Sequence, residues 1–247
     1  MFKRIIEAFF NVNGTKNIFG IFGPQLTAKQ TMKELLLIIL AYFIGSIPTA
    51  LIISKRFFGV DIREYGSGNM GATNTFRVLG AKFGTIVMVL DILKGVTAVA
   101  LFSFLPYYQT NDWDKTNLMV GLGLAAVLGH VFPVFAQFKG GKGVATLFGM
   151  ILTVQPVIAG SCVGVFLLVL FLTRYVSLSS ILAGVSLPVC VLWIWNDEVI
   201  IYRIFAVLVA CLIILTHQKN IIKILRGSES RVPIFKNRDK KKSAQVN

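Results

Sequence analysis

Residues 35–54 read LLLIILAYFIGSIPTALIIS and contain no charged side chain. A helix that crosses the hydrocarbon core of a bilayer needs about 20 predominantly apolar residues, and this stretch has that length. Backbone N–H and C=O groups in lipid must be hydrogen-bonded within the protein, so only helices and closed barrels span membranes. A barrel would show short strands of alternating polarity, which this run does not. The stretch therefore predicts a transmembrane helix.

Five further apolar runs predict that the chain crosses the membrane several times. The composition agrees, because 55% of the residues are hydrophobic and 15% charged, with a mean hydropathy of +0.73. A soluble domain usually has about 25% charged residues. No Pro/Ser-rich linker separates two cores, so we expect one all-α, polytopic transmembrane helix bundle. The further runs are residues 83–105, 117–138, 144–172, 178–195 and 199–216.

The net charge of +14 could indicate a nucleic-acid-binding protein. Almost all of the basic residues, however, lie outside the apolar runs, in the loops and terminal segments where membrane proteins place them, so we expect no nucleic-acid partner. The three cysteines, Cys162, Cys190 and Cys211, lie far apart inside apolar runs. Their number and spacing favour neither a metal site nor a disulfide framework, and we interpret them as small packing residues.

The number of spans depends on the run at residues 144–172, which is interrupted by Pro156. The positive-inside rule places both the basic loop at residues 55–82 and the basic stretch from His217 in the cytoplasm. Two spans within the interrupted run give seven spans in total, which satisfies the rule with the N-terminus outside, whereas six would export the basic stretch. We prefer seven spans, with five as the alternative if residues 144–195 cross only once overall.

The two ends of the chain differ from its centre. Residues 1–31 precede Met32, which would make a natural start, and their basic residues do not suit an outside location. We interpret them as an N-terminal extension or a misassigned start, although their Phe and Ile residues could also form an interfacial helix. Residues 32–226 are predicted to form the membrane-embedded domain. The polar, basic tail at residues 227–247 is predicted to be disordered and attracted to anionic lipid headgroups.

The loop at residues 64–77, EYGSGNMGATNTFR, is predicted to bind a phosphate group. Its glycines let the backbone approach a ligand without Cβ obstruction, and successive amide groups in such a turn form a concave anion site. Its small polar side chains add neutral donors, and its arginine can hold a phosphate through two parallel hydrogen bonds. A flexible turn between two spans is the alternative interpretation. The candidate residues are Gly66, Ser67, Gly68, Asn69, Thr73, Asn74 and Arg77.

A second loop, FKGGKGVAT at residues 138–146, has two lysines around a glycine pair, just before a helix expected to begin at Val144. A helix N-terminus favours anions, so lysines there are unfavourable unless they face one, and such local conflicts tend to mark function. Ordinary positive-inside anchoring is the alternative. The second lysine is followed by glycine, so this is not a Walker A loop. The candidate residues are Lys139, Gly140, Gly141 and Lys142.

A third polar region consists of residues 174–180 and 217–226. Its histidine and asparagine are three residues apart, so they share a face of a helix, and they follow the last apolar run at headgroup depth. Polar groups that point into a bundle from this level are usually functional, although a solvated histidine is the alternative. The candidate residues are Ser177, Ser179, His217 and Asn220.

Some charged or titratable residues lie within the apolar runs themselves. Asp91 and Lys94 are three residues apart, and we interpret them as a pair whose charges neutralise each other. His130 lies at the end of a run, where a packing role and a functional role both remain open.

At these loops the chain resembles the bacterial acyl-phosphate:glycerol-3-phosphate acyltransferase family, known as PlsY. The resemblance covers about residues 32–226, and the two glycine-rich motifs between spans are its most specific part. It implies a seven-helix bundle in the bacterial cytoplasmic (inner) membrane with a site that faces the cytoplasm. It is carried by Gly45–Pro48, Gly66–Asn74 with Arg77, Gly129, His130 and Pro133, Phe138–Thr146, Tyr175–Ser180, and His217 with Asn220.

The resemblance implies an enzyme that transfers a fatty acyl group from acyl phosphate to the 1-position hydroxyl of glycerol 3-phosphate. The products would be lysophosphatidic acid and inorganic phosphate, in the first step of phospholipid synthesis. No metal and no cofactor are implied, and a soluble enzyme that makes acyl phosphate would act before it. A membrane transporter of an organic phosphate is the alternative, because anion-binding helix starts also suit transport.

Both implied substrates carry phosphate, which agrees with two basic, glycine-rich loops. We expect the first loop and Lys142 to stabilise charge on the acyl phosphate as it leaves, and the third region to hold glycerol 3-phosphate. Acyl phosphate is already activated, so we favour direct transfer in which the substrate's own phosphate accepts the hydroxyl proton. His217 as general base is a second mechanism, and Ser67 as an acyl-carrying nucleophile is a third.

Overall fold

The computed structural model describes residues 28–105, 112–195 and 199–232, and every regular element in this part of the chain is helical. The predicted all-α class is therefore confirmed. The expectations for residues 1–27 and 233–247 lie outside the described residues. The elements are α2 (Ala28–Ser46), α3 (Thr49–Phe58), η2 (Ile62–Glu64), α4 (Ala72–Ala100), η3 (Leu101–Phe104), α5 (Asp112–Val131), η5 (Val134–Ala136), α6 (Val144–Val154), α7 (Pro156–Thr173), α8 (Val176–Val189), the π-helix η6 (Cys190–Ile194), α9 (Ile200–Thr216) and α10 (Gln218–Leu225).

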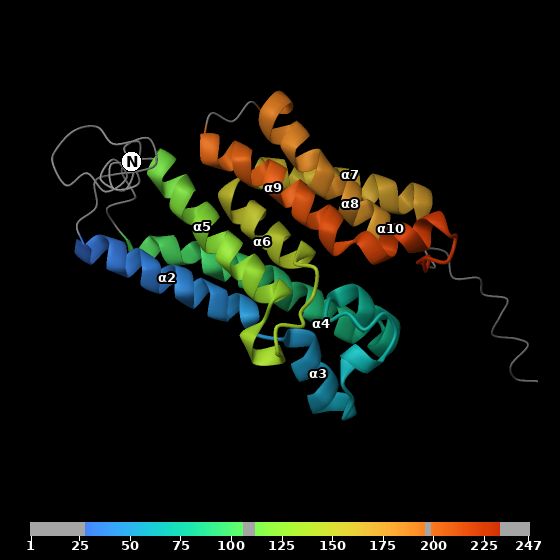
Figure 1. Ribbon diagram of the computed structural model, residues 1–247. Coiled ribbons are helices and arrows are strands. Elements are labelled where there is room, and N and C mark those ends of the chain that lie inside the picture. The colour runs from blue at the N-terminus through green and yellow to red at the C-terminus, as the bar shows by residue number, and fades with distance from the viewer. Residues whose placement is uncertain (1–27, 106–111, 196–198, 233–247) are drawn as a thin grey trace, which may run out of the picture.

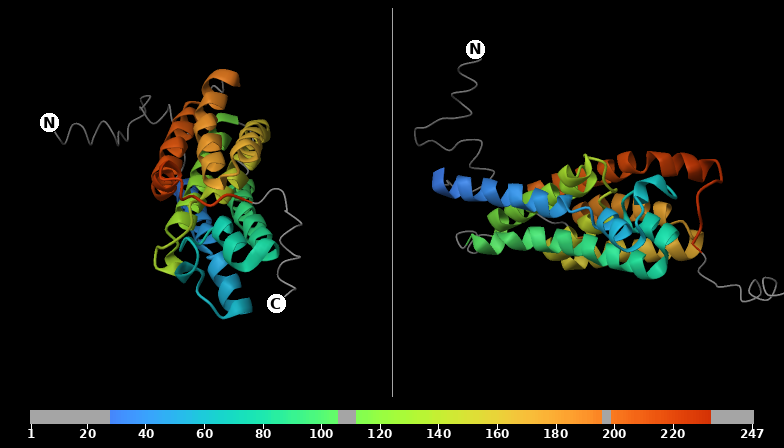
Figure 2. Two further views of the ribbon diagram at one scale, coloured as in Figure 1. Left: turned by 90° about the vertical axis from the view of Figure 1, so that its right-hand side faces the viewer. Right: turned by 90° about the horizontal axis from the view of Figure 1, so that it is seen from below.

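The long helices lie side by side and successive ones run in opposite directions (Figures 1 and 2). As a result, the loops at residues 59–71 and 132–143, the turn between α7 and α8, and α10 lie at the same end of the bundle, and the start of α2 lies at the opposite end. The polar loops that are far apart in the sequence are thus gathered at one end, as the sequence predicts.

Among the described residues, five helical segments are long and apolar enough to cross a membrane, or six if α9 and α10, bent by 59°, count as one span. The apolar run at residues 144–172 is indeed two helices, because Gln155 leaves helical geometry and Pro156 begins α7, where its missing N–H costs nothing. However, α6 has only 11 residues, or about 16 Å at 1.5 Å per residue. The seven-span count is therefore not confirmed, and the alternative of five fits.

Close packing between α4 and α6 fixes where the second loop enters the bundle. A Cβ atom on Gly95 would lie 2.0 Å from the carbonyl oxygen of Thr146, and one on Gly149 would lie 2.0 Å from that of Ile92. Small residues at such crossings let two backbones approach closely in a membrane. The start of α6, which follows directly on the second loop, is held against α4 in this way.

Asp91, Lys94 and His130, all within the apolar runs, form one buried network with Thr49. Lys94 Nζ donates to Asp91 Oδ1 at 2.8 Å, and the hydroxyl of Thr49, at the start of α3, donates to the same oxygen at 2.6 Å. Nδ1 of His130 lies 3.7 Å from that oxygen as well. All four residues are buried. The predicted pairing of Asp91 with Lys94 is thus present, and it joins α3, α4 and the end of α5.

Removing one partner of this ion pair should destabilise the protein more than removing both. Asp91→Ala leaves the Lys94 ammonium buried without a carboxylate, which costs about 3–5 kcal/mol, whereas Asp91→Ala/Lys94→Met replaces both charges with apolar groups. We expect the double variant to have the higher melting temperature in detergent. Thermal unfolding of the purified variants measures this, and a double variant as unstable as the sum of the singles would contradict it.

Candidate active site

The first glycine-rich loop is shaped by one buried side chain. The amide nitrogen of Asn74, in the first turn of α4, donates to the carbonyl oxygen of Tyr65 at 3.0 Å and to that of Ile62 at 3.2 Å. Its amide oxygen accepts from the backbone N–H of Ser67 at 2.8 Å. Gly66 has a φ of +63°, which a side chain would disfavour. The loop therefore curls around Asn74, and the side chain of Ser67 is left exposed.

The loop ends at the N-terminus of α4, where an anion would be favoured. Gly71 precedes the helix and has no side chain with which to cap it. Thr73 and Arg77 are four residues apart in the first two turns, so they share one face of the helix, and both are exposed. A hydroxyl and a guanidinium group thus follow the glycine-rich turn on the same side. Asn69, within the turn, accepts from the N–H of Gly71 at 2.9 Å.

The second loop is folded tightly against the end of α5. The N–H of Gly141 donates to the carbonyl oxygen of His130 at 3.1 Å, and a Cβ atom on Gly140 would lie 2.1 Å from the same oxygen. A Cβ atom on Gly141 would lie 2.1 Å from Nε2 of His130. The glycine pair is therefore required by this close approach, and Lys142 follows directly on it.

Lys142 meets the third region through Asn220, near the start of α10. Its Nζ donates to the side-chain oxygen of Asn220, whose amide nitrogen donates to Glu229 Oε1 at 2.8 Å. The hydroxyl of Ser177, at the start of α8, donates to the same carboxylate oxygen at 2.9 Å. A continuous hydrogen-bonded chain therefore joins Lys142, Asn220, Glu229 and Ser177 across three segments of the sequence.

The segment after α10 turns back over the α7–α8 turn and brings Glu229 into this chain. Arg231 Nε donates to the hydroxyl of Tyr175 at 3.0 Å, and its guanidinium carbon lies 5.0 Å from the centre of that ring. The N–H of Val232 donates to the carbonyl oxygen of Arg174 at 2.9 Å. The sequence-based prediction did not include Glu229. The available signal was a lone carboxylate shortly after α10 in a strongly basic stretch.

The pKa of Lys142 is lowered from 10.5 to about 8, mainly because the amine is buried; the carboxylate of Glu229 opposes this change, and the positive charges of Lys223 and Arg77 add to it. Arg77, in the second turn of α4, is thus one of the charges that act on Lys142. An ammonium group that lacks a phosphate partner is costly to keep charged there. An anion bound beside Lys142 would stabilise its charged form.

The activity should therefore fall as the pH rises through about 8, because lysine carries its charge only below its pKa and the neutral amine cannot hold a phosphate. Phosphate monoesters are already fully ionised there, since their second pKa is about 6. We expect kcat/KM to fall about tenfold per pH unit above this point, and Lys142→Arg to remove the fall between pH 8 and 10. Rate profiles of both proteins, with Lys219→Arg as control, measure this; an unchanged profile in Lys142→Arg would assign the titration to another group.

His217 caps the C-terminal end of α9 and is buried. Its Nδ1 lies 2.8 Å from the carbonyl oxygen of Ile213, which can only accept, so Nδ1 carries the hydrogen. In the neutral ring Nε2 therefore holds the lone pair. His217 and Asn220 are both at the bend between α9 and α10, and the N–H of Asn220 donates to the carbonyl oxygen of His217 at 2.9 Å.

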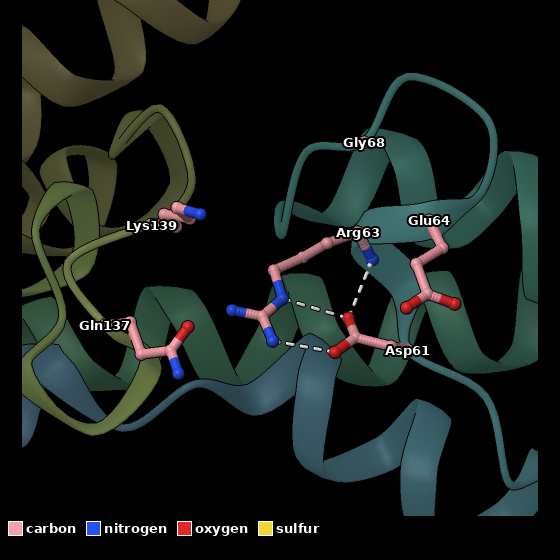
Figure 3. A pocket seen from close by; sticks show the side chains of 7 residues that line it. Asp61, Arg63, Glu64, Gly68, Gln137 and Lys139 are labelled. Atoms are coloured by element: carbon pink, nitrogen blue, oxygen red, sulfur yellow. Dashed lines mark hydrogen bonds and ion pairs between the residues drawn. The ribbon is translucent and has the colours of Figure 1, made fainter.

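The remaining candidates fall into two groups. Lys139 and Gly140 line a cavity of about 400 Å³ between the first and second loops, together with Gly68 and Arg63 (Figure 3). Ser179, by contrast, is fully buried and its hydroxyl donates to the carbonyl oxygen of Tyr175 at 2.8 Å, within α8. The structure thus brings the two glycine-rich loops together, whereas the side chains of Ser179 and Asn74 are buried and hydrogen-bonded to nearby backbone.

The family model described as glycerol-3-phosphate acyltransferase matches residues 35–227. The chain belongs to this family. A glycerol-3-phosphate acyltransferase of Chlorobium phaeobacteroides (strain BS1) is 44% identical over 80% of this chain and 96% of that protein. The glycerol-3-phosphate acyltransferase 2 of Bacillus anthracis is 48% identical over 81% of this chain and 99% of that protein.

The fold also matches two crystal structures of PlsY, an integral membrane glycerol 3-phosphate acyltransferase. The glycerol 3-phosphate form has a TM-score of 0.73 and 40% sequence identity, and covers 81% of this chain and 96% of PlsY. The lysophosphatidic acid form has a TM-score of 0.70 at the same identity, and covers 81% and 95%. The resemblance to the PlsY family is therefore confirmed, and the protein is an integral membrane acyltransferase that acts on glycerol 3-phosphate. The match to residues 35–227 does not test the predicted domain boundaries at residues 31 and 226, which therefore stay predictions.

Proposed function

We propose that the protein transfers a fatty acyl group from acyl phosphate to the 1-position hydroxyl of glycerol 3-phosphate, giving lysophosphatidic acid and inorganic phosphate. The observation that carries this proposal is the convergence of Lys142, Asn220 and Ser177 at the end of the bundle where α4, with Arg77 in its second turn, begins. Two phosphate-bearing substrates need cations and hydrogen-bond donors from more than one loop, and this end of the bundle has both.

The acceptor follows from the related structures. PlsY has been solved in a glycerol 3-phosphate form and in a lysophosphatidic acid form, which are a substrate and a product of such a transfer. The likeness of this chain to both forms supports the same pair here. Acyl phosphate as the donor rests on the two separate basic loops, since acyl phosphate brings a second phosphate to the site.

The first loop would bind the donor. Residues 66–69, Thr73 and Arg77 surround the N-terminal end of α4, where developing negative charge on a departing phosphate is stabilised. Lys142 would contribute its ammonium group from the second loop. Lys139, Gly140 and Gly141 of the same loop would line the site beside it. Asn74 would act by holding the turn in shape, because all of its described contacts are to the loop backbone.

The third region would bind the acceptor. Asn220 is half-buried and Ser177 is buried, and Glu229 accepts a hydrogen bond from each of their polar side chains. His217 lies one turn before Asn220 and supplies Nε2 as a hydrogen-bond acceptor for a hydroxyl group. Ser179 would contribute by stabilising the start of α8, since its hydroxyl is bonded within that helix.

The transfer itself would be direct. The 1-position oxygen of glycerol 3-phosphate attacks the acyl carbonyl carbon, the bond from that carbon to the phosphate oxygen breaks, and the hydroxyl proton moves to the phosphate that leaves. His217 as the general base is the competing mechanism, and its neutral tautomer is compatible with this role. Ser67 as a nucleophile is the third mechanism. Among the described hydrogen bonds, none joins its side chain to a group that could act as a base.

The active site would face the cytoplasm of a bacterium, with the bundle in its inner membrane. The basic loop at residues 55–82 and the basic stretch after α9 lie at the same end as the site, and the positive-inside rule assigns that end to the cytoplasm. A soluble enzyme that makes acyl phosphate could then deliver its product to this face.

A comparison of acyl donors tests the proposal. Purified protein in detergent should form lysophosphatidic acid from glycerol 3-phosphate when palmitoyl phosphate is the donor, and the same amount of palmitoyl-CoA or palmitoyl-acyl carrier protein should give less than about one hundredth of that rate. Product formation from either thioester at a comparable rate would disprove the choice of donor while leaving the acyltransferase class intact.

A further inference from the structure

Arg63 lies between the two glycine-rich loops and contacts both sides (Figure 3). It belongs to η2, just before the first loop. Its Nη1 reaches the carbonyl oxygen of Ala136 at 3.4 Å, 73 residues later in the sequence, in η5 just before the second loop. The side chain is half-buried. Arg63 is thus a direct polar connection between the loop with Ser67 and the loop with Lys142.

The guanidinium group is held in place by Asp61. Nε donates to Asp61 Oδ1 at 3.0 Å and Nη2 donates to Oδ2 at 2.7 Å, so the pair is bidentate. Asp61 Oδ1 also accepts from the backbone N–H of Arg63 at 3.0 Å and so caps η2. These hydrogen bonds with Arg63 lower the pKa of Asp61 from 3.8 to about 2. A bidentate pair fixes the direction of the guanidinium plane, which a single contact would not.

The segment that Arg63 contacts carries unusual backbone geometry. Gln137 and Phe138, directly after Ala136, have φ values of +57° and +58°. Residues with side chains rarely adopt this region, and they persist there only where surrounding contacts require it. The carbonyl oxygen of Ala136 accepts from Arg63 and from the N–H of Lys139 at 3.2 Å. The contact with Arg63 therefore lies at the start of the strained turn that leads to the second loop.

The cavity between the loops is bounded by the same residues. Arg63, Glu64 and Gly68 form one wall, and Gln137, Lys139 and Gly140 form the other. Its volume is about 400 Å³. The width of this cavity is set by the distance between the loops, and Arg63 is the side chain that crosses from one wall toward the other (Figure 3).

We propose that the Asp61–Arg63 pair is a positioning device that fixes the two phosphate-binding loops relative to each other, so that acyl donor and acceptor meet in reactive geometry. This inference rests on the proposed function. Arg63 is a positioning residue here, because its described contacts are to Asp61 and Ala136, which leaves each loop able to bind its own phosphate without it. Alignment between the two loops is what would be lost.

The expected kinetic result is a fall in kcat with nearly constant KM values. A displacement of about 1 Å between reacting groups can lower a rate by about 100-fold. Arg63→Gln should therefore reduce kcat about 10- to 100-fold and change KM for either substrate less than about threefold. Arg63→Lys should be intermediate, because one ammonium cannot hold both carboxylate oxygens and the carbonyl of Ala136. Asp61→Asn should resemble Arg63→Gln, and the double variant should be no worse than the more impaired single variant.

The control is Arg56→Gln, the same substitution at an exposed arginine on α3, which should keep the wild-type kcat. A readout independent of activity is the distance between spin labels at Tyr65→Cys and Val134→Cys, both exposed positions on the two loops. The labels would be placed in a Cys211→Ser background, because Cys211 is the exposed one of the three cysteines. The wild type should give one narrow distance distribution and Arg63→Gln a broader or shifted one.

An unchanged kcat in Arg63→Gln would overturn the proposal, and so would a lower kcat with an unchanged distance distribution. A large rise in one KM with kcat retained would also overturn it, because Arg63 would then be a direct phosphate ligand. The distance measurement also separates this proposal from the proposed function. If the wild type failed to use acyl phosphate, the distance distributions would still show whether Arg63 holds the loops together.

Discussion

Replacing Lys142 with alanine should lower kcat about 100- to 1,000-fold, the size of effect expected when one donor to a developing negative charge is removed. Lys142 lies where the three polar segments meet: it follows the glycine pair packed on His130, it donates to Asn220, and Arg77 influences its pKa. Lys139, the other lysine of the second loop, lines the cavity between the loops instead, so we expect no neighbouring side chain to take over the position of Lys142. Steady-state rates with acyl phosphate and glycerol 3-phosphate measure the loss.

The control for this substitution is Lys219→Ala, which removes an exposed lysine from α10 close to the same region. It should retain wild-type activity, which would show that the loss in Lys142→Ala does not come from lowering the general positive charge. Size-exclusion profiles and melting temperatures of the two variants should match that of the wild type. Activity within threefold of wild type in Lys142→Ala would remove the second loop from the proposed site.

Arg77→Ala should cause the second large loss, about 100-fold or more in kcat/KM, while the protein still inserts and folds. Arg77 is exposed on the face of α4 that it shares with Thr73, one turn from the glycine-rich loop, and its guanidinium can bind two phosphate oxygens at once. Arg77→Lys should recover only part of the activity, because an ammonium group is a point charge without this geometry. Purified protein in detergent is the system for the measurement.

Arg56→Ala is the matched control for Arg77, since it truncates an exposed arginine at the same end of the bundle. It should leave kcat/KM unchanged. If Arg77→Ala retained wild-type turnover, or if Arg77→Lys were as active as the wild type, a bidentate role of Arg77 in phosphate binding would be ruled out.

The helical class could be predicted from the sequence because long uncharged runs leave few alternatives in lipid. The number of spans could not. The run at residues 144–172 is long enough for two crossings by hydropathy, but Gln155 and Pro156 divide it so that α6 has only 11 residues. Similarly, the first run breaks before Thr49 into α2 and α3, and Gly80, with a φ of +82°, interrupts α4. Such breaks depend on local backbone geometry, which composition does not report.

The meeting of the loops could also be predicted, since basic loops on one side of a membrane are the only ones that can share a site. The role of each side chain was harder to predict. Asn74 and Ser179 belong to polar motifs, yet both are buried and bonded to nearby backbone. Glu229 gave little signal because its place beside Ser177 depends on the return of the chain through Arg231 and Tyr175. A sequence motif identifies the polar residues of a loop, but it does not give the direction in which each side chain points.

The claim on which the rest depends is that both phosphates are handled at one reaction centre, and the stoichiometry of a single turnover tests it most directly. Excess protein would be mixed with acyl phosphate, with and without glycerol 3-phosphate, and inorganic phosphate and lysophosphatidic acid would be measured together over time. We expect no phosphate release without glycerol 3-phosphate, and with it one phosphate released for each lysophosphatidic acid formed, at the same rate. A burst of phosphate that precedes the lipid product, or that appears without the acceptor, would contradict direct transfer at a single centre.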